Sequence, residues 1–285
     1  MTNEKWSVGV FASIGAGLGV QLDVVKELGI KTIQLHTPHK NSRTQENADR
    51  FKARLTEIGA EVSVVFCGFD GESYADIPTT QKTIGLVPES TRAERTQEIK
   101  EIADFAKLLG CDAIGIHVGF IPHEEDDPHT FSDLAALVGC LCDYLAQQGQ
   151  RMHMETGQET ADNLLKFIAK VGRDNLFINF DPANMILYGS GEPIEALKKV
   201  GQYVRSCHCK DGKWSSLPGI EWGTEVPFGD GDVNARKFLE TLKEIGYFGP
   251  LTIEREIPQE PERQKAEISR AKTLIETLKA EILVE

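Results

Sequence analysis

Eight short apolar segments, each followed by a segment of helical periodicity, constrain the fold of this chain more than any other feature. The segments are rich in Val, Ile and Phe, which is typical of parallel strands buried on both faces. They occupy residues 6–12, 32–38, 62–68, 113–119, 151–157, 176–182, 204–210 and 251–257. Several of the helical segments between them end at a glycine, which can terminate a helix in the left-handed conformation. Strict alternation of strand and helix implies a parallel sheet with right-handed crossovers.

Eight such units predict a closed (β/α)8 barrel, a TIM barrel, rather than an open sheet. The chain has 285 residues, and α/β barrels of this length routinely form one domain. No Pro/Gly-rich linker or shift in composition divides it, so we expect a single α/β domain over residues 1–285. Two long connections, residues 69–90 and 211–233, leave the carboxyl ends of strands, where barrels build their active sites. They are interpreted as lids or substrate walls, with decorative insertions as the alternative.

Bulk composition narrows the class of protein. The net charge is −13 and the sequence holds no basic run, which argues against a DNA or RNA partner. No apolar run approaches the roughly 18 residues that span a bilayer, and the first residues lack the pattern of a secretory signal. Six cysteines in a chain of this length are not a secreted disulfide framework. We therefore expect a reduced, cytoplasmic protein without a membrane partner.

Polar residues stand at the carboxyl ends of the predicted strands, where a strand buried on both faces should be apolar. Side chains alternate along a strand, so if Glu155 points into the barrel, Met154 faces the helices. The same parity turns the apolar neighbours of Asp181, His208 and Glu254 outward. Four successive strands thus bring a glutamate, an aspartate, a histidine and a second glutamate to one rim of the barrel.

Three carboxylates that converge in one pocket repel one another and cannot all stay ionised alone. One divalent metal ion resolves this repulsion. Three carboxylates and a neutral imidazole form a hard, mostly oxygen site, which favours Mn²⁺, Mg²⁺ or Co²⁺, with Zn²⁺ and Fe²⁺ as alternatives. The sequence therefore predicts that Glu155, Asp181, His208 and Glu254 bind one metal ion. Separate salt bridges from each residue to lysines and arginines are the other interpretation.

Five stretches in order along the chain carry a resemblance to a known family. They are METG (154–157), NFDPANMILYG (179–189), HCKD (208–211), GDGDV (229–233) and IERE (253–256). In these stretches the chain resembles the xylose isomerase-like TIM barrels, the sugar phosphate isomerase/epimerase group with the AP endonuclease 2-like fold. The resemblance implies a metal site on the same four residues. It also implies that Glu155 and Glu254 act as the acid/base pair, one on each face of the substrate.

Asn184 helps to separate the branches of this family. The endonuclease IV branch would require three zinc ions, more histidines and a histidine at this position, and we reject that reading together with the acidic net charge. Many ketose epimerases also carry a histidine there that touches the substrate. An amide can hydrogen-bond a hydroxyl group but cannot carry a proton at neutral pH, so the exact activity stays open.

The reaction implied by the resemblance starts with a hydroxy-ketone or hydroxy-aldehyde that chelates the metal. The metal stabilises the enediolate that forms when a carbon loses its proton to Glu155 or Glu254, and the other glutamate returns a proton. Depending on where the proton returns, the result is epimerisation or isomerisation, and loss of a β-hydroxyl gives dehydration. The leading hypothesis is a metal-dependent sugar or cyclitol isomerase/epimerase. The alternatives are an inosose-dehydratase-like lyase and a sugar-binding barrel without catalysis.

Further residues are candidates for contact with the substrate. Lys210 shares the face of His208 and could hold a substrate oxygen or form a structural ion pair with a neighbouring carboxylate. His117 and His36 end other strands, and each is either a substrate contact or a histidine packed at the rim. Asn184 is the candidate for a hydroxyl contact.

Other residues have two readings that the sequence leaves open. Trp214 could form an apolar wall for a sugar ring together with Trp222 and Phe228, or all three could belong to a packed loop. His153 lies a layer deeper than the metal ligands, and we expect it to pack. The relatives implied by the resemblance are often dimers or tetramers, so a homo-oligomer is expected.

Three patterns imitate functional motifs. The glycines of residues 15–19 follow the first strand, but their spacing differs from a dinucleotide loop, and we interpret them as a flexible loop. The acidic stretch at residues 123–129 is interpreted as a solvated loop in which Asp127-Pro128 starts a helix. The cysteine pairs at 140/142 and 207/209 are interpreted as core residues.

Overall fold

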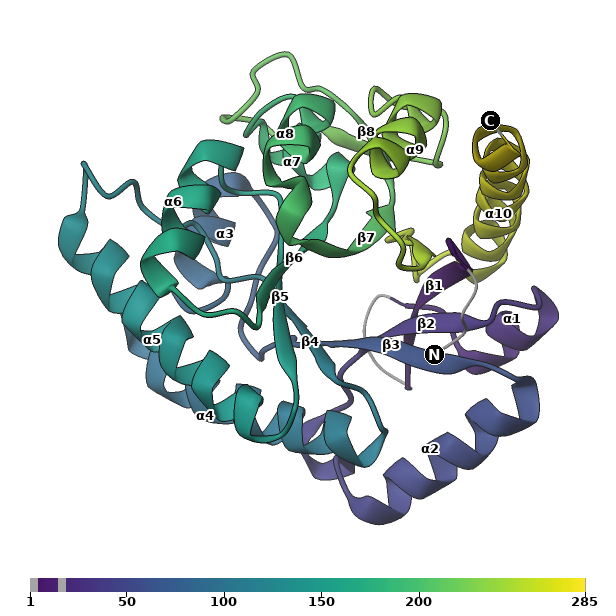
Figure 1. The fold of residues 1–285 in the computed structure, drawn as a ribbon, viewed down its shortest axis with the longest axis horizontal. Helices are drawn as coiled ribbons and strands as arrows, with labels where there is room; N and C mark the ends of the chain where they lie inside the picture. Colours follow the sequence, from purple (N-terminus) through teal and green to yellow (C-terminus); the bar gives the residue numbers. More distant parts are fainter. Residues whose placement is uncertain (1–4, 15–18, 285) are drawn as a thin grey trace.

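A computed structural model of the chain describes residues 5–14 and 19–284 and contains a closed barrel of parallel strands. The strands follow the order β1-β10-β7-β6-β5-β4-β3-β2 around the barrel, and helices surround it (Figure 1). This confirms the predicted TIM barrel. The barrel strands are β1 (Val8–Ser13), β2 (Thr32–His36), β3 (Glu61–Phe66), β4 (Ala113–Ile116), β5 (Arg151–Glu155), β6 (Leu176–Phe180), β7 (Val204–Cys209) and β10 (Leu251–Ile253).

The helices occupy the segments between the strands. They are α1 (Leu22–Glu27), α2 (Gln45–Ile58), α3 (Ile77–Thr83), α4 (Glu89–Leu108), α5 (Pro128–Gln147), α6 (Ala161–Val171), α7 (Pro182–Tyr188), α8 (Pro193–Val200), α9 (Ala235–Glu244) and α10 (Pro261–Val284), with 3-10 turns at Lys40–Ser42 and Gly201–Tyr203. In the part of the chain that the structure describes, no helix has the length and apolar character needed to cross a membrane.

Local signals in the sequence set the ends of these helices. Gly59 caps α2 with a φ of 69°, a left-handed conformation that glycine adopts without steric cost. Asp127 starts α5 as predicted, because its Oδ1 accepts the backbone N–H of Thr130 at 3.0 Å. The glycine pattern of residues 15–19 lies largely outside the described residues.

The cysteine prediction is wrong at one position. Cys142, Cys207 and Cys209 are buried as expected, whereas Cys140 is exposed. Residues 140 and 142 are separated by about 200° around an α-helix, so they point to opposite sides of α5. One of the pair therefore packs in the core while the other faces solvent.

Aromatic rings fill the middle of the barrel beneath the predicted site. The centroids of the Phe11 and Phe66 rings lie 5.7 and 5.4 Å from the imidazole of His208. Gly115 makes room for them, since a Cβ at this position would lie 2.6 Å from the Phe66 ring. These rings form an apolar floor under the polar rim.

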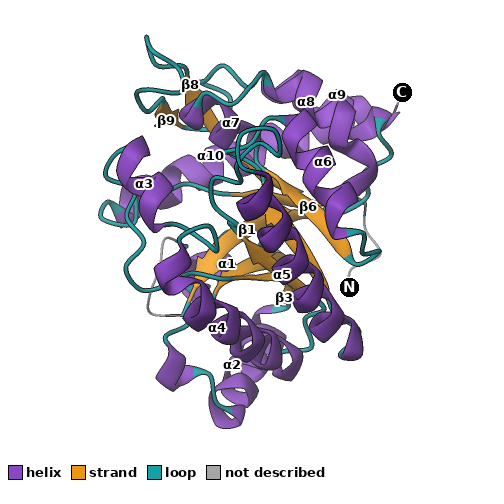
Figure 2. Ribbon diagram, turned by 90° about the vertical axis from the view of Figure 1, so that its left-hand side faces the viewer, coloured by secondary structure: helices purple, strands orange, loops and turns teal. Residues whose placement is uncertain are grey.

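The two long connections contain secondary structure of their own. Residues 69–90 include α3, and residues 211–233 include the antiparallel pair β8 (Asp211–Lys213) and β9 (Thr224–Val226). Figure 2 shows α3 and the β8–β9 pair on the same side of the molecule. Asp211 braces the second connection by accepting the backbone N–H groups of Gly212, Gly229 and Val233 at 2.9–3.1 Å. Both connections supply residues to the site described next.

Candidate metal centre

Four buried side chains meet at the carboxyl ends of neighbouring strands. Glu155 ends β5, Asp181 follows β6, His208 lies near the end of β7 and Glu254 follows β10. One ligand atom from each lies within 4.8 Å of the other three. The strand parity therefore predicted a convergence that the structure contains.

The strand ends hold this arrangement through local hydrogen bonds. Thr156 Oγ1 donates to the backbone carbonyl of Asp181 at 3.0 Å and accepts its N–H at 2.8 Å, which ties the end of β5 to the end of β6. Asp181 also caps α7, since its Oδ1 accepts the N–H of Asn184 at 3.0 Å. Its Oδ2 remains directed toward His208 Nδ1, at 3.3 Å.

The imidazole of His208 is the hub of the cluster. Its Nδ1 lies 2.7 Å from Glu155 Oε1 and 3.2 Å from Glu254 Oε2. On the opposite side of the ring, Nε2 donates to Gln34 Oε1 at 2.6 Å. Gln34 is itself oriented by donating from its Nε2 to Asn179 Oδ1 at 3.1 Å. With the proton on Nε2, the Nδ1 lone pair faces the carboxylates, as in a metal-binding histidine.

The electrostatics of the cluster test whether a cation fits. Burial alone would lower the pKa of His208, but the carboxylates of Glu254 and Glu155 raise it well above its ordinary value. Burial opposes ionisation of Glu254, yet His208 and Lys210 lower its pKa to about 2. The three carboxylates thus demand positive charge at the position that Nδ1 faces. Hard oxygen donors and one neutral imidazole nitrogen satisfy the requirements of a divalent metal ion.

Each of the two glutamates has a second basic partner. His117 Nε2 lies 2.6 Å from Glu155 Oε2, and Lys210 Nζ donates to Glu254 Oε2 at 3.0 Å. Although burial lowers it, the charge of Glu155 raises the pKa of His117 to about 9. The two candidate acid/base groups are therefore distinguished by their environment, with a histidine beside one and a lysine beside the other.

Lys210 is almost fully buried and lies among oxygen atoms. Its Nζ also donates to Asn184 Oδ1 at 3.2 Å, contacts Glu256 and lies 3.8 Å from Asp181 Oδ2. The sequence left Lys210 either as a substrate contact or as a structural ion pair. The structure is consistent with both interpretations, because the ammonium group is ion-paired and also borders the cavity.

A cavity of about 290 Å³ opens above the cluster, and we call it the carboxyl-end cavity. Glu155 and Glu254 line it. Of the side chains predicted to contact substrate, it is lined by His36, His117, Asn184 and Lys210.

Trp214 does not line the carboxyl-end cavity, which corrects the prediction for the seventh connection. Trp214 follows β8, and its side chain is 37% exposed. Trp222 lines the cavity instead and packs against Tyr188, with the ring centroids 4.5 Å apart and the ring planes tilted by 59°. Phe228 is buried in the core, as the packed-loop reading expects. This wall of the cavity is thus formed by the part of the connection that leads into β9.

Sequence reasoning missed several residues that surround the site. Gln34 orients His208, and Glu256 and Tyr74 line the cavity. A signal existed for the first two: Gln34 is a polar residue inside an apolar strand, and Glu256 shares the parity of Glu254. No such pattern marks Tyr74, which comes from the connection after β3.

His153 lies deeper, as predicted. It is 3% exposed and its Nδ1 contacts Ser206 Oγ at 2.8 Å. Burial, together with the nearby charges of Arg151 and Arg205, lowers the pKa of His153 to about 3. It is therefore neutral and takes no part in the metal cluster.

A (β/α)8 barrel with a carboxylate-histidine cluster at the carboxyl ends of its strands defines a class of metal-site barrels. The model of the xylose isomerase-like TIM barrel family matches residues 22–277. The chain belongs to this family.

Individual relatives differ in how much of the chain they match. A xylose isomerase domain protein from Planctomyces limnophilus is 53% identical, covers 99% of this chain and 100% of its own, and superposes with a TM-score of 0.96. An inosose dehydratase from Clostridium botulinum is 30% identical over 115 residues, which are 36% of this chain and 38% of that enzyme. The chain thus matches less than half of the length of this curated relative.

A sugar epimerase shares the fold alone. The D-allulose 3-epimerase from Methylomonas sp., solved in complex with D-allulose, is 16% identical, covers 96% of this chain and 97% of its own, and has a TM-score of 0.70. The shared architecture places the two chains in one fold without fixing a common reaction.

Proposed function

We propose that this protein is a metal-dependent isomerase or epimerase of a sugar or cyclitol, acting on a carbon next to a carbonyl group. The observation that carries the proposal is the position of Glu155 and Glu254. Both belong to the four-residue cluster, and both line the carboxyl-end cavity. A site that only bound a sugar would not need two carboxylates facing the same ligand.

Glu155, Asp181, His208 and Glu254 would hold the metal ion, which is Mn²⁺, Mg²⁺ or Co²⁺ by the oxygen-rich donor set. When bound, a divalent ion supplies Lewis-acid stabilisation of negative charge on substrate oxygens. The cluster accepts such an ion without rearrangement of His208, whose Nε2 is already held by Gln34.

The side chains that line the cavity have separate roles in proton transfer, charge compensation and substrate binding. One glutamate accepts the proton from carbon and the other returns one, each from its own side of the cluster. His117 beside Glu155 and Lys210 beside Glu254 compensate the charge that each carboxylate carries in turn. Asn184 hydrogen-bonds a substrate hydroxyl through its amide.

The walls of the cavity suit a polyhydroxylated ring. Trp222 and Tyr188 provide an apolar face, and the cavity volume of about 290 Å³ suits a molecule the size of a hexose or inosose. We propose a small-molecule sugar or cyclitol as the only partner of the site, without nucleic acid. The acidic lining of the cavity and the net charge of −13 both disfavour a polyanion.

A dehydratase of the inosose type is the second candidate. The curated relative supports it, since an inosose dehydratase is 30% identical over 115 residues. Lys210 supports it as well, because its buried ammonium group borders the cavity beside Glu254 and could donate a proton to a departing hydroxyl group.

A panel of keto-sugars and inososes, incubated with the protein in deuterated water, tests the proposal and separates the two candidates. Proton NMR is expected to show deuterium incorporation next to the carbonyl together with an epimerised or isomerised product. Loss of water from an inosose would instead assign the dehydratase. Absence of exchange across the panel, with metal supplied, would remove the proposed function.

Elemental analysis of protein purified without chelator tests the metal separately. We expect about one divalent ion per chain, because the structure brings together one set of four ligands in its described part. Added Mn²⁺ should restore any stability that chelation removes. A metal-free protein whose melting temperature ignores Mn²⁺ would contradict the assignment of the cluster.

A further inference from the structure

A second cavity opens at the opposite end of the barrel, and we call it the amino-end cavity. It has a volume of about 560 Å³. Its lining includes Glu61 and Val62 at the start of β3, Arg151 at the start of β5, and Pro250 just before β10. The cavity is therefore formed by the amino ends of the strands. The volume falls in the range of small-molecule sites.

One buried nitrogen of a residue that lines this cavity has no hydrogen-bond partner among the described residues. His153 lines it and is 3% exposed, and its Nδ1 is engaged by Ser206 Oγ. Its Nε2 is buried and makes no hydrogen bond to any described residue. A buried polar atom without a partner is costly unless water or a ligand satisfies it. The same atom is inaccessible to solvent, so it makes the base of the cavity polar without being exposed in it.

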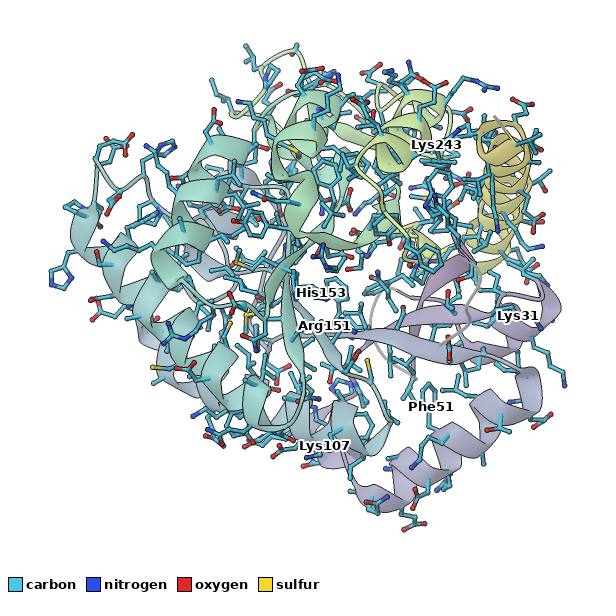
Figure 3. All side chains as sticks on the ribbon, in the orientation of Figure 1. Lys31, Phe51, Lys107, Arg151, His153 and Lys243 are labelled. Carbon is cyan, nitrogen blue, oxygen red and sulfur yellow. The ribbon has the colours of Figure 1, made fainter. Side chains whose placement is uncertain are left out.

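Two arginines stand around this histidine. Both Arg151 and Arg205 line the cavity and act electrostatically on His153. Figure 3 labels Arg151 and His153 close to one another along β5. Arg151 pairs with Asp112 through Nη2 at 2.6 Å, but its buried Nε has no hydrogen-bond partner among the described residues.

Arg205 is held in place without using a carboxylate. Its Nη1 donates to the backbone carbonyls of Gln202 and Val204, and its guanidinium lies 4.5 Å over the Phe177 ring. Among the described residues it forms no ion pair. Arg205 is an exposed residue, so solvent hydrates its charge, and the contacts that hold its guanidinium leave it available to bind an anion.

The other walls of the cavity are mainly apolar. They include Leu55, Val62, Val64 and Leu109, with the exposed ring of Phe248 at the opening. A ligand paired with the arginines would therefore place an apolar body against these side chains. Inorganic phosphate would leave this surface uncovered, and a neutral apolar molecule would leave the guanidinium charge unpaired.

We infer that the amino-end cavity binds a small organic acid, a monocarboxylate with an apolar body, at a site separate from the metal cluster. The carboxylate pairs with Arg205 and Arg151, and the apolar body contacts the aliphatic wall. This site does not depend on the proposed function. It lies directly beneath the cluster, since His153 and Ser206 each precede a metal-cluster residue by two positions on the same strand face.

Benzoate, with benzamide as its neutral counterpart, provides the test. Methyl-labelled protein, loaded with Mg²⁺, is titrated with each probe and followed by NMR. Benzoate should shift the methyl resonances of Val62, Val64 and Leu109 and leave Leu187, which lines the carboxyl-end cavity, unchanged. Benzamide should bind about tenfold more weakly, because it lacks the charge that the arginines recognise.

A variant pair assigns the binding to its arginine. Arg205→Gln should weaken benzoate binding by about tenfold, whereas Arg173→Gln, at an exposed arginine that pairs with Asp143, should not change it. The inference is overturned if benzoate shifts only Leu187 or shifts no methyl group. It is equally overturned if benzamide binds as tightly or if Arg205→Gln binds like the wild type.

Discussion

The two ends of the barrel differ in whether their buried polar groups have close partners. At the carboxyl ends, His117 lies 2.6 Å from Glu155 and Lys210 lies 3.0 Å from Glu254, so every buried charge has a close partner. At the amino ends, a buried nitrogen of His153 has no hydrogen-bond partner in the part of the chain that the structure describes. The first arrangement also gathers three carboxylates around His208, which suits one cation. The second leaves binding capacity for a ligand of the other sign.

The same contrast is visible in the two histidines that face these cavities. The pKa of His117 is raised to about 9 by Glu155, while that of His153 is lowered to about 3 by burial and nearby arginines. Both residues lie on adjacent strands of one barrel, so the difference comes from their neighbours rather than from the fold. Parallel strands give a barrel two chemically distinct ends, because the four cluster residues gather where the strands finish, whereas the amino end carries arginines beside Glu61 and Asp112.

The largest expected effect comes from removing a carboxylate at the carboxyl end. With saturating metal, Glu155→Gln and Glu254→Gln should each lower kcat/KM, for the substrate found by deuterium exchange, by about 10²–10⁴-fold, the usual contribution of an acid/base group. The exposed Glu195→Gln on α8 serves as the control and should retain the wild-type rate. Undiminished α-proton exchange in both glutamine variants would disprove the acid/base pair.

A smaller effect is expected from replacing a residue that orients a cluster residue but does not belong to the cluster itself. Gln34→Leu leaves His208 Nε2–H buried without its acceptor, so metal affinity should fall by about 10–100-fold. Titration calorimetry with Mn²⁺ measures it. Gln150→Leu is the matched control, because Gln150 also makes buried hydrogen bonds, to Ala103 and Cys111, away from the metal cluster. Equal loss of affinity in both variants would show a general effect on stability instead.

The aromatic wall of the carboxyl-end cavity should contribute less again. Trp222→Ala removes apolar contact with the substrate and is expected to raise KM by about tenfold, with little change in kcat. Trp214→Ala, in the same connection but outside the cavity lining, should leave both constants unchanged. Steady-state kinetics of the two variants decides the matter, and a larger effect at Trp214 would restore the sequence-based assignment.

The contrast between Trp214 and Trp222 shows where sequence reasoning stops. Strand parity is fixed by the pleat, so the inward direction of Glu155 and the other cluster residues follows from the sequence pattern. A tryptophan in a connection between strands follows no regular alternation of side chains, so the sequence does not indicate where it points. Which of the two faces the substrate depends on how β8 and β9 fold back, and the long-range bonds from Gly229 and Val233 to Asp211 help to fix that.

The amino-end cavity was inaccessible to sequence reasoning for a different reason. His153 was correctly expected to lie deep in the barrel, and its residue type alone suggested packing. An unfilled volume beside it arises from the sizes of many neighbours, among them the small residues Ala113 on the adjacent β4 and Ser206 on β7. Voids are a property of packing in three dimensions, and no local pattern records them.

The smallest expected effect concerns stability and distinguishes the two ends by pH. Because the pKa of His153 falls from 6.5 to about 3 on folding, the unfolded chain binds more protons between these values. This contribution to stability is present above the unfolded pKa and is lost as the pH falls toward the folded one. His153→Gln has no such titration. The melting temperature of the wild type should therefore fall more steeply than that of the variant between about pH 7 and about pH 4.

The exposed His129→Gln on α5 provides the reference for this experiment, since its side chain is 86% exposed and its removal should leave the wild-type slope intact. Differential scanning calorimetry across the pH range compares the three curves. Parallel curves for the wild type and His153→Gln would mean that the imidazole is protonated at no cost, and hence that the amino end of the barrel is well hydrated. A steeper wild-type curve supports a neutral histidine beside Arg151, which pairs with Asp112, and Arg205, which has no ion pair among the described residues.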